Sequence, residues 1–133
     1  MTGTEIIGAL LLESVELTAI VAAPRIKAGR LPDGTSLPAL LIRTVSSVEF
    51  QPLRRGNIVR TTDRVSVAVR ASSYREQVQI MRLVRKCCAG RTGDIGGGVR
   101  VSILTAGMGP DVNGPGDTFE QTQDFRVSFD APV

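Results

Sequence analysis

The sequence predicts an α+β protein made of one domain, residues 1–133, with about four mainly antiparallel strands and two helices packed on one face of the sheet. Its length and its 42% hydrophobic content fit one compact domain with its own core. Apolar residues follow helical spacing in two regions and alternate with polar ones in others. The connections are short, which favours antiparallel neighbours in the order α-β-β-α-β-β.

The first predicted helix begins near Thr4. Thr2 or Thr4 caps it, and Glu5 lies in the first turn, where the helix dipole favours an acid. Residues 14–16 interrupt the helix before a second, shorter helical turn. The apolar stripe of these two segments consists of Ile6, Ile7, Leu10, Leu11, Leu17, Ile20 and Val21.

Two strands follow a loop at residues 30–38, in which Pro32, Gly34 and Pro38 favour turns. Residues 39–50 are rich in apolar and β-branched side chains, which is typical of a strand. Residues 51–60 are expected to form a long hairpin loop. Residues 61–71 alternate strictly, and this predicts a strand whose core face consists of Val65, Val67 and Val69.

Ser72 or Ser73 caps the second helix, and Glu76 lies three residues after Ser73, as in a capping box. Gly90 and Gly93 end this helix. Its predicted core stripe is Val78, Met81, Val84 and Cys88. A strand at residues 99–104 is expected to turn Val99, Val101 and Ile103 inward. Residues 106–118 form a long polar loop, and a final strand at 119–130 turns Phe125, Val127 and Phe129 to the core.

The residue inventory argues against catalysis and cofactors. The chain has no histidine, and its only cysteines are the adjacent Cys87 and Cys88, so it lacks a histidine triad and a spaced disulfide framework. The glycine-rich residues 93–98 follow a helix and lack the third glycine of a dinucleotide loop. A calcium loop that starts at Asp111 fails at Pro115 and Thr122. We therefore expect no enzyme, cofactor or metal site, and no membrane partner, because no apolar run approaches about 18 residues.

The net charge of +3 is divided unevenly along the chain. Residues 54–91 carry ten basic and two acidic side chains, whereas residues 92–133 carry two basic and six acidic ones. Such a division fits either nucleic-acid binding or contact between the basic surface of one copy and the acidic surface of another. Few aromatic side chains lie nearby to stack on bases. The candidate contact residues are Arg54, Arg55, Arg60 and Arg64 around the hairpin, and Asp111, Asn113 and Asp117 in the polar loop.

The order and spacing of these segments resemble the tail terminator, or tail completion, proteins of long-tailed bacteriophages and gene transfer particles. The resemblance extends along nearly the whole chain. It rests on residues 17–21 (LTAIV), 24–26 (PRI), 37–38 (LP) with 40–43 (LLIR), 64–69 (RVSVAV) followed by 73–76 (SYRE), and 123–127 (QDFRV).

This resemblance implies a structural virion protein of the tail-neck region, assembled in the host cytoplasm. Such proteins form a ring, usually a hexamer, that caps the tail tube, ends its polymerisation and joins the tail to the head-completion or connector protein. DNA passes through the ring without sequence-specific binding. The polar loop at 106–118 is expected to order on docking. Two alternatives stay open: a small basic nucleic-acid-binding protein, and another neck component such as a head-closure protein.

Overall fold

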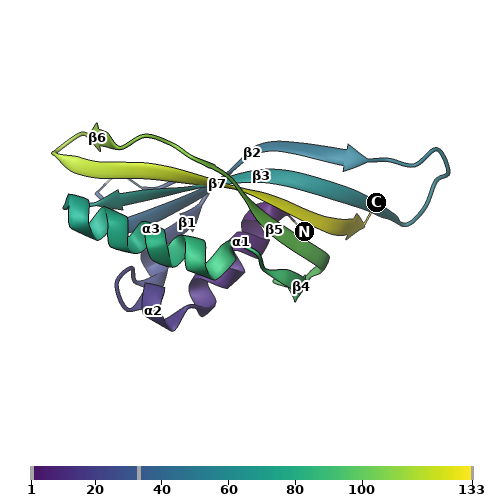
Figure 1. Ribbon diagram of the computed structural model, residues 1–133, viewed down its shortest axis with the longest axis horizontal. Coiled ribbons are helices and arrows are strands. Elements are labelled where there is room, and N and C mark those ends of the chain that lie inside the picture. The colour runs from purple at the N-terminus through teal and green to yellow at the C-terminus, as the bar shows by residue number, and fades with distance from the viewer. Residues whose placement is uncertain (1, 33, 133) are drawn as a thin grey trace.

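The computed structural model describes residues 2–32 and 34–132, and it shows one twisted sheet with helices on one face (Figure 1). The helices are α1 (Gly3–Glu13), α2 (Val15–Thr18), the 3-10 turn η1 (Ala23–Arg25) and α3 (Tyr74–Cys88). The strands are β1 (Ile26–Ala28), β2 (Ala39–Phe50), β3 (Ile58–Ala71), β4 (Thr92–Ile95), β5 (Gly98–Met108), β6 (Val112–Gly114) and β7 (Thr118–Pro132).

The sheet is built around four long antiparallel strands, β2, β3, β7 and β5, which correspond to the four predicted ones. The full order is β1-β2-β3-β7-β5-β4, with β6 also paired to β7. The short strand β1 pairs with β2 in parallel, whereas the other pairings are antiparallel. The α+β class and the mainly antiparallel sheet are therefore confirmed.

The core lies between the helices and one face of the sheet. Alternation turns every second residue of β3 and β7 toward the helices, and Val65, Val67 and Val69 meet Phe125 and its neighbours there, all fully buried or nearly so. The predicted helix caps are also confirmed. Thr2 Oγ1 accepts from Glu5 N, Ser73 Oγ accepts from Glu76 N, and Glu76 in turn accepts from the backbone of Ser72. The sequence pattern thus predicts the centre of the molecule well.

The predicted count of four strands and two helices is wrong. Strands β1, β4 and β6 have only three or four residues each, so their own sequences carry no alternation that could predict them. They form because a longer neighbour supplies the hydrogen-bond partners. Strand β4 overlaps the glycine-rich stretch and β6 lies within the predicted polar loop, whereas α2, directly after Ser14, corresponds to the second, shorter helical turn that the sequence predicts.

Several predicted boundaries and side-chain directions also need correction. Val99 is 48% exposed rather than inward, because the register of β5 shifts after it and Arg100 adopts a left-handed backbone with φ of 53°. Val78 lies outside the core at 38% exposure. The hairpin loop is shorter than residues 51–60, because β3 begins at Ile58. The buried residues of α3 are Gln77, Ile80, Met81, Val84, Cys87 and Cys88.

The outer part of the β2–β3 hairpin extends beyond the helices (Figure 1). We call residues 45–58 the arm: the outer part of β2, the turn, and Ile58 of β3. All of residues 43–50 are exposed, although they belong to a strand whose first four residues are buried or half-buried. A register shift between Thr44 and Ser46 marks the change. The first part of β2 therefore packs in the core, and its second part is exposed to solvent.

A buried carboxylate fixes the base of the arm. Asp63 of β3 is 4% exposed, and it accepts hydrogen bonds from Gly3 N at 2.9 Å and Ser47 Oγ at 2.5 Å. It thereby binds an otherwise unpaired amide at the start of α1 and one side chain of β2. Position 3 also requires glycine, because an added Cβ would lie 2.8 Å from Asp63 Cβ. The start of α1 and the arm are thus held to the same point of β3.

Candidate interaction surfaces

Ion pairs join β3 to β7 on the sheet face that the helices leave open. Because β7 runs antiparallel to β3, the acids of the C-terminal segment lie beside the arginines of the central segment. The pairs are Arg60–Asp130 at 3.1 Å, Arg64–Asp124 at 2.8 Å and Arg70–Glu120 at 2.8 Å. The basic and acidic segments therefore neutralise much of each other's charge within one subunit. The uneven charge along the chain does not by itself create two opposite surfaces.

Two of the predicted contact arginines are held inside the subunit by these pairs. Arg60 Nη1 also donates to the carbonyl oxygen of Arg100 at 2.6 Å, and Arg64 Nη2 donates to that of Ala106 at 2.8 Å. Both side chains keep part of their surface exposed. Their first role in the structure is to join β3 to β5 and β7, so a substitution at either position tests the fold together with any contact.

Arg54 and Arg55 lie instead in the turn of the arm and are exposed. Neither forms an ion pair within residues 2–32 and 34–132. The arm also carries large apolar side chains in contact with solvent: Val45, Val48, Phe50, Leu53 and Ile58. A hollow of about 240 Å³ lies under the turn between Glu49, the two arginines and Pro132. The arm therefore combines two available cations with an unusual amount of exposed apolar surface.

The predicted acidic loop lies at the opposite end of the sheet (Figure 1). Asp111 Oδ1 accepts from Gln77 Nε2 at 2.9 Å, and Gln121 Nε2 donates to Gly109 O at 3.0 Å. These bonds attach the first part of the segment to α3 and β7. Asn113 belongs to β6 and is exposed, and Asp117 follows in a turn with φ of 58°. Residues 106–118 are thus largely part of the sheet rather than one long loop.

A groove beside Asp111 was not predicted. It has a volume of about 320 Å³, and its exposed apolar side chains include Tyr74, Val78 and Met108. A hydrogen bond with Asp111 and the charge of that carboxylate raise the pKa of Tyr74. Arg82 and Arg85 also line the groove. We call it the β6-end groove, and no sequence signal indicates it, because it joins a helix, a strand end and a loop from distant parts of the chain.

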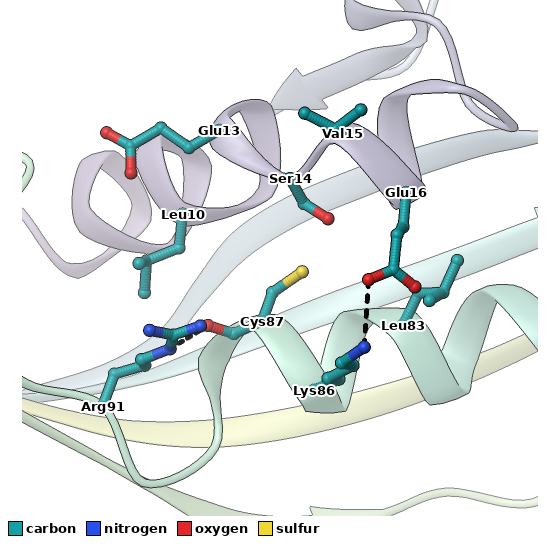
Figure 2. Close-up of a pocket in the computed structure, with 9 residues that line it drawn as sticks. All are labelled: Leu10, Glu13, Ser14, Val15, Glu16, Leu83, Lys86, Cys87 and Arg91. Atoms are coloured by element: carbon teal, nitrogen blue, oxygen red, sulfur yellow. Dashed lines mark hydrogen bonds and ion pairs between the residues drawn. The ribbon is translucent and has the colours of Figure 1, made fainter.

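A second pocket lies in the helix layer and has a volume of about 310 Å³. Figure 2 shows it between the α1–α2 corner and the last turns of α3. Lys86 Nζ forms an ion pair with Glu16 at 2.9 Å, and Arg91 Nε donates to Cys87 O at 3.1 Å. We call this pocket the helix socket, and the residues that line it are Leu10, Glu13, Ser14, Val15, Glu16, Leu83, Lys86, Cys87 and Arg91.

The two cysteines of the chain lie at the end of α3 and belong to the core. Both thiols are free and buried, and burial raises the pKa of Cys88 to about 12, so it stays protonated and unreactive at neutral pH. The part of the chain that the structure describes contains no cluster of three or more His, Cys, Asp or Glu residues able to hold a metal. In the same residues, no helix has the length and hydropathy to cross a membrane.

A sheet domain with exposed apolar side chains gathered on an arm and beside grooves is typical of an assembly subunit. The comparison of sequences identifies the kind of assembly. The chain belongs to the family described as Tail completion protein gp17, which matches it over residues 5–130. It is therefore a structural protein of the bacteriophage tail, located in the tail-neck region of the virion, and the predicted family resemblance is confirmed. The family is one of structural proteins rather than enzymes.

A solved structure supports the fold. A chain in a structure described as "Virion of native gene transfer agent (GTA) particle" matches with a TM-score of 0.70. The match covers 97% of this chain and 95% of that chain at 10% sequence identity. At this identity the likeness shows a shared fold. No curated protein sequence matches the chain significantly.

Proposed function

We propose that this chain, as one tail-terminator-like domain, forms a ring, with six copies, that caps the tail tube. The ring ends the polymerisation of the tube protein and joins the tail to the head-completion or connector protein. DNA passes through it without sequence-specific binding. The observation that carries the proposal, beyond family membership, is that one subunit presents several unlike surfaces: the arm and the β6 end at opposite ends of the sheet (Figure 1), and the helix socket in the helix layer. A head-to-tail ring requires two different surfaces on each subunit.

In this proposal the candidate residues contribute unequally. Arg54 and Arg55 contact a neighbouring copy or an adjoining tail or head protein, because they are exposed and have no ion pair among the described residues. Asn113 and Asp117 contribute to a second surface at the β6 end. Arg60, Arg64 and Asp111 have partners within the subunit and support these surfaces.

The test uses particles assembled in cells that lack this chain and receive it from a plasmid. Without the chain, electron microscopy is expected to show tails of irregular, excessive length that are not joined to heads. Supplying the natural sequence restores uniform, joined tails, whereas the double variant Arg54→Glu with Arg55→Glu reduces joined particles at least tenfold. The matched control is Arg30→Glu with Arg126→Glu, two exposed arginines outside the arm and the grooves that form no ion pair among the described residues, and it is expected to restore joining. Normal tail length without the chain contradicts the proposal.

The same particles distinguish the alternatives. A head-closure protein would remain attached to heads that lack tails, and immunogold labelling would place it there. A nucleic-acid-binding protein would bind DNA in purified form, with an affinity that falls steeply as salt rises. Labelling at the end of isolated tails, together with weak binding to DNA, supports the terminator role.

A further inference from the structure

We propose that the arm of one copy inserts into the helix socket of the next copy, with Leu53, Arg54 and Arg55 at its tip. This inference rests on the proposed ring and specifies the contact that closes it. The arm is residues 45–58, and the socket is the pocket between the α1–α2 corner and α3 (Figure 2).

The arm exposes a concentration of large apolar side chains to solvent. Phe50 is 61% exposed, and Leu53 at the turn is fully exposed. Val45, Val48 and Ile58 are each more than half exposed, so five large apolar side chains lie within one segment of 14 residues. Scattered exposed apolar residues are ordinary, but a concentration of them marks a contact with another protein. The arm extends past the helices, and the part of the chain that the structure describes leaves these side chains exposed.

The socket also has exposed apolar side chains, which could pack against those of the arm. Val15, the first residue of α2, lines the socket and is 82% exposed, and Leu12 in the last turn of α1, outside the lining, is 48% exposed. Leu10 and Leu83 line its sides (Figure 2). Its volume of about 310 Å³ lies at the lower end of the range, roughly 300–1,000 Å³, in which proteins bind ligands. It has the capacity for one large side chain and part of a second.

The charges of the two surfaces are complementary. Helix α1 ends at the socket and has no basic residue in its last turn, so the partial negative charge of its C-terminus favours a cation there. Glu13 adds a full negative charge there and has no ion pair within the described residues, whereas Glu16 is already paired with Lys86. The arm supplies Arg54 and Arg55. Lys86 and Arg91 also line the socket, but neither forms an ion pair with Glu13, so an arginine from another copy would pair with Glu13.

The β6-end groove fits the arm less well. Arg82 and Arg85 line that groove, and Arg75 lies on the same exposed helix. Like charges that face each other across an interface oppose binding. The charged residues that line the groove, Asp111, Arg82 and Arg85, carry a net positive charge. The two acids and two bases that line the socket instead balance, and its Glu13 has no ion pair within the described residues. We therefore assign the socket, rather than the groove, as the binding site for the arm of the next copy.

Cysteine crosslinking in assembled particles tests the contact. Leu53→Cys and Val15→Cys are introduced together, with Cys87→Ser because Cys87 also lines the socket. After mild oxidation, a non-reducing gel is expected to show a ladder of covalent multimers up to the full ring. Each single variant is expected to yield monomer only. The matched control pair, Leu53→Cys with Val78→Cys, targets the β6-end groove and should also yield monomer; a ladder from this pair overturns the inference.

A charge exchange provides an independent readout. Arg54→Glu with Arg55→Glu is expected to reduce rings in negative-stain images at least tenfold, and adding Glu13→Arg to the same chain is expected to restore most of them. Rings that are indifferent to both changes, together with no ladder from the Leu53–Val15 pair, overturn this contact and leave the proposed ring in place. The absence of rings in particles carrying the natural sequence instead overturns the proposed function.

Discussion

The two halves of strand β2 differ in what covers them rather than in what they are made of. The inner half, Ala39 to Ile42, pairs with β3 beneath the helices, and Leu40 and Ile42 are buried. The outer half also carries apolar side chains, such as Val48 and Phe50, yet they remain exposed on the arm. A strand pattern thus predicts pairing, but it does not tell which part of a strand belongs to the core and which part belongs to an interface.

The largest expected effect compares two phenylalanines. Phe125 is fully buried, so Phe125→Ala should lower the free energy of unfolding by about 3–5 kcal/mol. Phe50 is exposed on the arm, so Phe50→Ala should change it by less than about 0.5 kcal/mol in the isolated chain. Denaturant unfolding of both variants measures the difference. Equal losses would place the arm within the folding core and remove the distinction.

The next effect lies at the base of the arm. Asp63→Ala leaves the amide of Gly3 and the hydroxyl of Ser47 without their partner, and such a loss costs about 1–3 kcal/mol. Melting temperature and hydrogen exchange at the start of α1 should both report it. Thr62→Ala, which removes only a hydroxyl pair with Ser128 on the open face of the same strand, provides the control and should not affect hydrogen exchange at the start of α1. A variant at position 63 as stable as the natural chain would show that the arm has no anchor there.

The pH dependence of stability reports on the core, in contrast to the exposed arm, through the buried thiol of Cys88. Burial raises the pKa of Cys88 from about 9 to about 12, so the folded state favours the protonated thiol. This contribution is complete below pH 9 and is lost as the pH rises from 9 toward 12. Denaturant unfolding across that range should show falling stability, and Cys88→Ala should flatten the fall. Rapid alkylation of native Cys88 at pH 8 would contradict its buried state.

The smallest effect separates the two kinds of arginine. Arg64→Ala removes a partly exposed ion pair with Asp124 and a hydrogen bond to Ala106 O, and should cost about 1–2 kcal/mol. Arg54→Ala should leave the stability of the isolated chain unchanged, because this side chain has no ion pair among the described residues. Denaturant midpoints measure both. A loss at Arg54 as large as that at Arg64 would indicate a structural role for the turn.

Sequence periodicity predicts the parts of this fold that depend on neighbouring residues. The alternation of Val65, Val67 and Val69 and the capping by Ser73 and Glu76 are local patterns, and both are confirmed. The family resemblance was recognisable for the same reason, because it rests on the order of such segments.

The missed features all join distant parts of the chain. Gln77 is a polar residue that becomes fully buried because Asp111 and Gln121, 34 and 44 residues away, accept its amide protons. The ion pairs between β3 and β7 depend on strand register, so composition alone suggested separate basic and acidic surfaces. The helix socket forms only where the α1–α2 corner meets α3. No pattern within one segment carries that information.

The central claim is that the arm is an interface surface between copies. A cryo-electron microscopy reconstruction of the neck in assembled particles tests it most directly. The account predicts a ring at the end of the tail tube in which Leu53 of each copy lies against Val15 of the next, with Arg54 or Arg55 beside Glu13. A ring in which every arm extends into solvent, or rests on Arg82 and Arg85 of its neighbour, would contradict it.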